Sequence, residues 1–216
     1  MARTTSAQPE SSRRRQRWAD GYDPENTRSS LIASALELFE RRGFDRTSVQ
    51  EIAERARLTK GAFYHHFESK DDLLRHIQEE YLDAQLAAIQ RIEAGSDDPK
   101  VRMAELIRVG LTSVAEYRAH VTIFYQERRY LTGALFAEVT RKHDLVEAAF
   151  AAIVADGVTR GAFRPDVDAR IAMLGVVGMC AWAYQWLNLS GPLSVDEVAR
   201  QFGAMVLEGL EAPAAR

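Results

Sequence analysis

Apolar residues recur at spacings of three and four along most of this chain, and no stretch alternates between apolar and polar residues. The first pattern places apolar side chains on one face of an α-helix, whereas alternation would indicate a half-buried strand. The sequence therefore predicts an all-α fold. Because 46% of the 216 residues are hydrophobic, the chain can bury a core in one large domain or two small ones.

Charge is unevenly distributed along a chain whose formal net charge is -3. Residues 1–20 carry a net charge of +3, residues 21–70 are neutral, and the remainder holds -6. A basic start and an acidic remainder fit a DNA-binding end joined to a body that does not touch DNA. Residues 1–22 are rich in Ser, Thr, Gln and Arg and lack an apolar period, so we expect a disordered basic arm there.

Cap residues divide the next segment into three helices. Asp23 followed by Pro24 begins the first helix, and Gly43 ends it. Thr47 and Gln50 have the spacing of a capping box, which predicts the start of a short second helix. The third helix is expected to follow directly after a tight turn.

That turn spans residues 56–58, and Thr59 is a suitable N-cap for a third helix that runs to Phe67. Two short helices joined by a three-residue turn form a helix-turn-helix, whose second helix can enter the major groove of DNA. Such pairs also occur as plain packing in all-helical domains. The geometry alone leaves both interpretations open.

The rest of the chain is predicted to form six more helices. Ser69 and Asp72 open a long helix that ends near residues 95–99. Five helices follow at roughly 99–117, 119–128, 131–160, 167–188 and 195–210. Residues 171–195 contain no charged residue, but polar residues and Pro192 limit the unbroken apolar run to 14 residues. That length is typical of a buried helix and too short for a membrane span.

The order and spacing of five motifs in residues 32–70 point to a family. The motifs are Ile32–Phe39, Arg42–Phe44, Thr47–Val49, Glu51–Ala53 and Lys60–Lys70. This segment resembles the DNA-binding domain of the TetR family of transcriptional regulators. The resemblance implies a homodimer with the arm at 1–22, a helix-turn-helix DNA-binding domain at 23–70 (motif about 48–67), and a C-terminal helical ligand-binding and dimerisation domain at 71–216.

The resemblance also implies which residues face DNA, namely Thr47, Ser48, Gln50, Thr59, Lys60, Gly61, Tyr64, His65, His66 and Lys70. The chemistry agrees, because free N–H groups at helix N-termini bind phosphates and Lys60 and Gln50 can reach base edges. Arg57 departs from the family, which usually has Gly in this turn. A left-handed conformation at Arg57 would cost about 1 kcal/mol.

Three stretches of the body loosely resemble regulators that sense acyl-CoA thioesters: Glu127–Leu131, Gly161–Arg164 and residues 178–194. The resemblance implies a repressor of a palindromic operator that is released by a small-molecule effector, such as an acyl-CoA thioester. The alternatives are a regulator that senses a lipophilic drug-like compound and a regulator without a small ligand. Candidate ligand-binding residues are Phe124, Arg128, Arg129, Arg141, Trp182 and Trp186. Candidate dimer-interface residues are Val177, Ala181, Tyr184, Val198, Phe202 and Met205.

The remaining chemistry-bearing residues predict no catalytic or metal site. His65 and His66 point about 100° apart on a helix, and the other histidines lie far away in the sequence. Cys180 lies within an apolar run, which favours a buried structural thiol over a nucleophile. No signal peptide opens the chain. We therefore expect a cytoplasmic regulator, not an enzyme, whose partners are double-stranded DNA, a small effector and a second copy, with no cofactor and no membrane contact.

Overall fold

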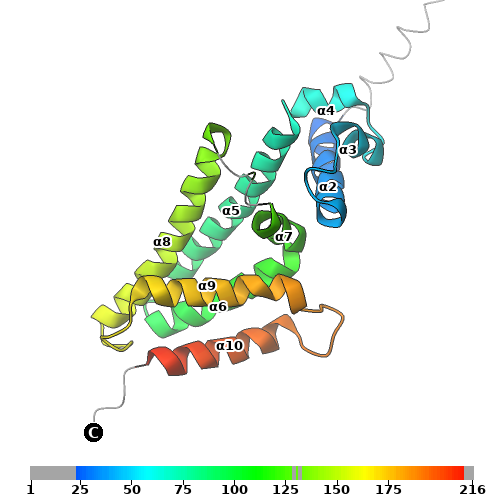
Figure 1. The fold of residues 1–216 in the computed structure, drawn as a ribbon. Coiled ribbons are helices and arrows are strands. Elements are labelled where there is room, and N and C mark those ends of the chain that lie inside the picture. The colour runs from blue at the N-terminus through cyan, green and yellow to red at the C-terminus, as the bar shows by residue number, and fades with distance from the viewer. Residues whose placement is uncertain (1–22, 128–129, 131–132, 212–216) are drawn as a thin grey trace, which may run out of the picture.

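The computed structural model describes residues 23–127, 130 and 133–211. These residues form nine α-helices, one 3₁₀ turn and no β-strand, which confirms the predicted all-α fold (Figure 1). The helices are α2 (Pro24–Arg42), α3 (Val49–Arg55), α4 (Lys60–His66), α5 (Lys70–Gly95), α6 (Pro99–Glu116), α7 (Arg118–Gln126), α8 (Ala137–Thr159), α9 (Ala169–Trp186) and α10 (Val195–Leu210), with the 3₁₀ turn η2 at Ala134–Phe136.

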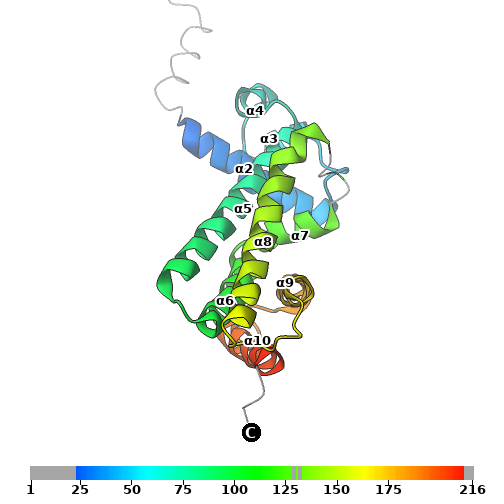
Figure 2. The same ribbon diagram turned by 90° about the vertical axis from the view of Figure 1, so that its left-hand side faces the viewer.

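The helices divide between two ends of an elongated molecule. Helices α2, α3 and α4 form one end, and α5 runs from them into the body (Figure 1). In the body α8 lies beside α5, and α6 packs against α5, α8, α9 and α10 (Figure 2). Helix α7 also packs against α2, so the three-helix end and the body touch away from α5. This contact brings residues far apart in sequence together.

Side-chain caps set most helix starts where the sequence predicted them. The Asp23 carboxylate accepts hydrogen bonds from the backbone N–H groups of Glu25 and Asn26. The Ser69 hydroxyl accepts from the Asp72 N–H at 3.0 Å, and Ser194 caps α10 in the same way. Such caps satisfy N–H groups that have no partner within the helix.

The predicted capping box of the second helix is wrong by one residue. Ser48 is the N-cap of α3, and the Glu51 carboxylate accepts a hydrogen bond from the Ser48 N–H at 2.8 Å. Thr47 is buried, and its hydroxyl donates to the carbonyl of Gly43 at 3.0 Å. The Gln50 side chain donates to Glu54 instead. Thr47 and Ser48 are both good caps, and burial of Thr47 leaves the cap position to Ser48.

The predicted helix at 131–160 begins later than expected. Gly133 adopts a positive φ of 78°, a conformation that an α-helix cannot contain. The chain then makes the 3₁₀ turn η2 before α8 starts at Ala137. Helix α7 likewise ends at Gln126, two residues before its predicted end.

One continuous apolar core joins both ends of the molecule. Phe39, Phe63 and Phe67 fill the three-helix end, and Leu106 and Val154 are among the side chains that fill the body. Within the described residues, no helix combines the length and hydropathy that crossing a bilayer requires.

Helix α8 comes unusually close to the chain that follows it. Gly157 lies against the ring of Phe163, and a Cβ atom added at Gly157 would lie 2.1 Å from the Phe163 ring. Phe163 is fully buried, so the ring has little room to move. Glycine at this position therefore permits the close approach of the α8–α9 connection.

We expect Gly157→Ala to lower the free energy of unfolding by about 1–3 kcal/mol through overpacking. Urea denaturation measures the change. Gly95→Ala is the matched control, because a Cβ there meets nothing within 4 Å. The control should raise stability by up to about 1 kcal/mol, the helix preference of Ala over Gly. Equal effects in the two variants would contradict this packing.

Candidate functional site

Helices α3 and α4 form a helix-turn-helix at the end of the molecule. Arg57, in the turn between them, has a φ of 58° and is the one non-glycine residue with positive φ among those described. The left-handed conformation considered for Arg57 is therefore present, at a cost of about 1 kcal/mol. The Leu58 N–H donates to the carbonyl of Ala53 and closes the turn at 2.8 Å.

Most of the residues predicted to face DNA are exposed on this motif. They are Ser48 and Gln50 near the start of α3, Thr59 before α4, and Lys60, Gly61, Tyr64 and His65 on α4. Tyr64 is 51% exposed, and the Lys60 ammonium lies 5.8 Å from the centre of its ring. The structure thus groups a cation, an aromatic ring and two helix N-termini on one surface, which suits phosphates and base edges.

Three residues assigned to this surface are buried or half-buried. Thr47 is buried beneath the start of α3, so its side chain is not on the surface. The Lys70 ammonium donates to the carbonyls of Phe44 and Thr47 at 2.7 and 2.9 Å, and burial lowers the pKa of Lys70. His66 is half-buried, and burial lowers the pKa of its imidazole, followed by repulsion from His65 and Arg28. A neutral His66 is a poor phosphate ligand at pH 7.

Ion pairs fix α3 against α2. Arg55 pairs with Glu37, and Arg42 pairs with Glu51 at 3.0 Å. The hydrogen bond from Arg55 is the main cause that lowers the pKa of Glu37. Because these side chains are partly exposed, each pair adds little stability, but together they orient the motif relative to α2.

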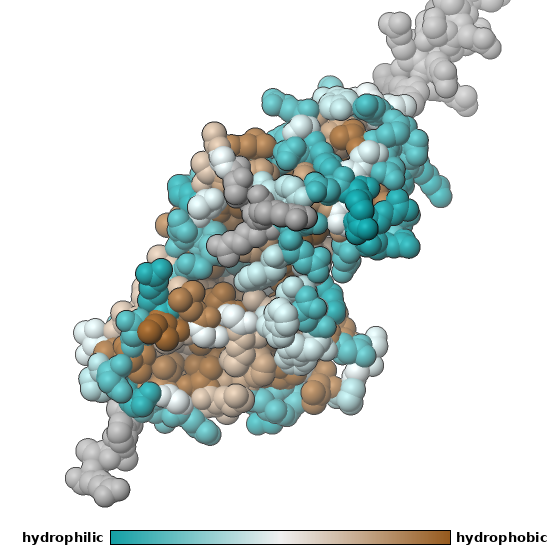
Figure 3. Space-filling model, in the orientation of Figure 1, coloured by the Kyte–Doolittle hydropathy of each residue, from teal (hydrophilic) through white to brown (hydrophobic). Residues whose placement is uncertain are grey.

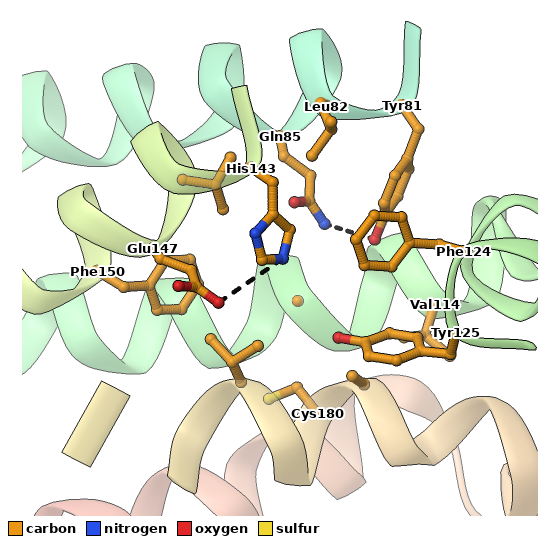
Figure 4. A pocket seen from close by; sticks show the side chains of 14 residues that line it. Tyr81, Leu82, Gln85, Val114, Phe124, Tyr125, His143, Glu147, Phe150 and Cys180 are labelled. Carbon is orange, nitrogen blue, oxygen red and sulfur yellow. Dashed lines mark hydrogen bonds and ion pairs between the residues drawn. The ribbon is translucent and has the colours of Figure 1, made fainter. Parts of the chain in front are cut away.

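A hollow lies inside the body, between α5, α6, α7, α8 and α9 (Figure 4). Its cavity volume is about 70 Å³. The lining residues are mostly apolar or aromatic: Tyr81, Leu82, Gln85, Gly110, Val114, Phe124, Tyr125, His143, Val146, Glu147, Phe150, Val177, Cys180 and Ala181. A concave apolar site with a few convergent polar groups is the usual form of a small-molecule site.

Two polar pairs face the hollow from the neighbouring helices α5 and α8. On α5 the Gln85 amide donates to the Tyr81 hydroxyl, and on α8 His143 lies 3.7 Å from Glu147 (Figure 4). Phe124 stacks on His143 with ring centres 5.2 Å apart. The prediction from sequence missed both pairs. Their spacing of four residues, on otherwise inward-facing positions, is the signal that could have found them.

Gln78 is another polar residue on α5, which contributes three residues to the lining of the hollow. It is fully buried on α5, and neither polar atom of its side chain has a protein hydrogen-bond partner among the described residues. It lies one helical turn before Leu82. An orphaned buried amide costs about 1–3 kcal/mol, so a bound water or ligand group is expected to satisfy it.

The side chains that line the hollow are poorly suited to bind a metal ion or to act as a nucleophile. Burial raises the pKa of the Cys180 thiol to about 12, so the reactive thiolate is scarce. Within the described part of the chain, His143, Asp144 and Glu147 are the group whose ligand atoms lie close enough to share a cation. Asp144 is exposed and does not line the hollow.

The candidate ligand-binding and interface residues differ in where they lie in the protomer. Phe124 lines the hollow as expected, whereas Trp182 and Trp186 do not and are 61% and 44% exposed. Val177 and Ala181, assigned to the dimer interface, line the hollow instead. The apolar residues of α9 surround the helix, so periodicity could not separate its two faces.

The remaining candidate interface and ligand-binding residues differ in exposure. Tyr184 and Val198 are buried within the protomer and cannot form an exposed interface, whereas Phe202 is half-buried and Met205 is 64% exposed. Arg141 lies away from the hollow and pairs with Glu138 at 2.6 Å. Arg128 and Arg129, like the arm at 1–22, lie outside the described residues.

Two family descriptions match this chain. Residues 31–77 match the family described as bacterial regulatory proteins, tetR family. Residues 96–210 match the family described as tetracyclin repressor-like, C-terminal domain. Together the two matches cover both ends of the molecule and extend over more than half of its length.

Relatives resemble the chain over most of its length. The HTH-type transcriptional repressor KstR2 of Mycolicibacterium smegmatis is 28% identical over 188 residues, covering 87% of this chain and 92% of the relative. The structure of the ketosteroid transcriptional regulator KstR2 of Mycobacterium tuberculosis has a TM-score of 0.80 at 26% identity, covering 86% of this chain and 95% of that one. AibR, solved in complex with isovaleryl coenzyme A and operator DNA, has a TM-score of 0.75 at 26% identity and covers 83% of this chain and 97% of AibR.

Proposed function

Because this chain belongs to the TetR family of bacterial transcriptional regulators, we propose that it is a ligand-responsive repressor that binds a palindromic operator as a homodimer. The observation that carries the proposal is one chain with two sites: an exposed helix-turn-helix surface and a hollow in the body. Repression is proposed because the KstR2 relatives are repressors. The working place of such a protein is the cytoplasm, where operator DNA lies, and no catalysis is required of it.

For the operator, the proposed contacts are the exposed residues of α4 together with Ser48 and Gln50. Lys60 and Tyr64 lie side by side at the centre of that surface. Both side chains are exposed, and the Tyr64 ring also packs edge-on against the buried Phe63 with ring centres 5.4 Å apart, so the fold of each variant is verified separately.

We expect Lys60→Ala and Tyr64→Ala each to weaken operator binding by about 1–3 kcal/mol without unfolding the protein. Gel-shift titration measures affinity, and circular dichroism verifies the fold. Lys100→Ala is the matched control, because Lys100 lies in the body and pairs with Glu211. Unchanged affinity in both α4 variants would show that α4 does not read the operator.

For the effector, we propose an acyl-CoA thioester whose acyl group occupies the hollow. The lining residues are apolar, aromatic or neutral polar apart from the His143–Glu147 pair, and they include no lysine or arginine. Such a lining suits an acyl chain and leaves the phosphates of CoA outside the hollow. AibR, a structural relative, binds isovaleryl coenzyme A. The same lining would also accept a neutral lipophilic compound, which is the alternative effector.

We expect isovaleryl-CoA or a longer acyl-CoA to weaken operator binding, because the effector favours a conformation that binds DNA less well. CoA alone should have no effect. Ala181→Phe should fill the hollow and abolish the response while operator binding persists. A response to free fatty acid equal to that of the thioester would favour the lipophilic alternative, and a full response in Ala181→Phe would remove the hollow as the effector site.

For the homodimer, we propose an interface formed by the exposed faces of α9 and α10. Apolar side chains gather on this part of the surface (Figure 3). On α9 the exposed residues Ile171, Leu174, Trp182 and Trp186 share one face, and Met205 is exposed on α10. A second copy related by twofold symmetry would cover both faces in a four-helix arrangement.

We expect Trp182→Asp and Met205→Asp to yield monomers, because each places a charge in the proposed interface. Light scattering measures the mass in solution. Leu145→Asp is the control, since Leu145 is a similarly exposed apolar residue on α8. Dimers that persist in both interface variants would place the interface elsewhere.

A further inference from the structure

Helix α7 touches both proposed sites. Phe124 and Tyr125, at its C-terminal end, line the hollow (Figure 4). Tyr125 also stacks on Tyr184 of α9, with ring centres 6.0 Å apart. Glu127 follows two residues later and lies against the three-helix end. A displacement at the hollow would therefore be passed to Glu127 along one short helical segment.

The contact of Glu127 with the three-helix end is buried and specific. Its carboxylate accepts a hydrogen bond from the backbone N–H of Phe44 at 2.9 Å, and only 7% of Glu127 is exposed. A Cβ added at Gly43 would lie 3.1 Å from the same oxygen, so the backbone approaches the carboxylate closely. A buried carboxylate that loses its donor is left with an uncompensated desolvation cost, which favours the closed contact.

Tyr130 makes a second contact with the same turn. Its hydroxyl donates to the Asp45 carboxylate, and its ring lies 5.3 Å from the ring of Phe44. The Lys70 ammonium lies 4.1 Å from the centre of the same Phe44 ring. Phe44 and its neighbours are thus held from the body side and from the start of α5.

The turn at residues 43–47 leads directly into Ser48, the N-cap of α3. Any shift of Phe44 therefore moves the start of the helix-turn-helix. Helix α5 also links the two ends, but it does so as one continuous helix whose first turn belongs to the three-helix end. The contact through Glu127, like that through Tyr130, can form and break independently of the chain connection.

We propose that Glu127 and Tyr130 form a latch that couples occupancy of the hollow to the position of the helix-turn-helix. The proposal rests on the proposed function and adds its route of regulation. With the latch closed, α7 and the Phe44 turn move as one body. An effector that displaces Phe124 and Tyr125 changes the latch, and operator binding acts on the hollow through the same contact, since coupling between two sites is reciprocal.

Because operator binding should act on the hollow through the same contact, DNA can test the latch without an effector. The probe is double-stranded DNA selected from a random pool by the full-length protein. Hydrogen exchange of segment 118–126 is measured with and without this DNA in the wild type, Glu127→Gln and Tyr130→Phe. Glu116→Gln is the matched control, because it removes a carboxylate at an exposed position at the end of α6.

In the wild type and the control, DNA should change exchange of segment 118–126 by about fivefold or more, the lower end of ordinary coupling factors. In Glu127→Gln the change should fall to about twofold or less while the DNA still binds, and Tyr130→Phe should give a smaller loss. Without DNA, the Phe44 amide should exchange faster in Glu127→Gln, because a neutral amide oxygen is a weaker acceptor than the carboxylate that it replaces.

If Glu127 has a merely structural role, Glu127→Gln will lower the melting temperature but leave the DNA-induced change in hydrogen exchange of segment 118–126 intact. That result would overturn the latch. The latch is equally overturned if DNA changes nothing in segment 118–126 of the wild type. If Glu127→Gln does not fold, Tyr130→Phe, which keeps the ring in place, decides between these outcomes by the same readout. Failure of the wild type to select any DNA would instead remove the proposed function, and the latch with it.

Discussion

The arrangement of the molecule depends on helix α5, which buries its apolar side in both ends at once. Near its start Leu73, Leu74 and Ile77 are fully buried, and further along Leu82 and Ile89 are buried in the body. The 26 residues of α5 span about 39 Å at the rise of an α-helix. A rigid element of that length fixes the distance between the helix-turn-helix and the hollow. Only contacts beside α5, such as those of α7, can adjust the angle between the two ends.

The helix starts could be predicted because caps are local. Asp23, Ser69 and Ser194 each bond to an N–H two or three residues away, so the neighbouring sequence contains the whole interaction. The error at the start of α3 arose between two adjacent cap residues. Burial of Thr47 decided between them, and burial depends on the tertiary fold.

The faces of α9 and the contact of Glu127 could not be predicted in the same way. Apolar residues surround α9, so the sequence could not tell that Val177 and Ala181 face the hollow while Trp182 and Trp186 face outward. The Glu127 carboxylate meets a backbone N–H 83 residues earlier in the chain. Because the donor is a backbone N–H, which every residue except proline has, the type of residue at position 44 does not indicate the bond. The residues expected to face DNA came from the family resemblance, and the structure separates the exposed ones from Thr47 and Lys70.

The proposed function requires that a twofold-symmetric pair of these chains reads DNA through α4. The most direct measurement is to sequence the DNA that the full-length protein enriches from a random pool. A dimer with two equivalent reading helices predicts an inverted repeat whose half-sites lie on the same side of the duplex, about one helical turn or a multiple of it apart. Enrichment of a single asymmetric site, or no enrichment over the starting pool, would contradict a symmetric dimer that reads DNA through α4.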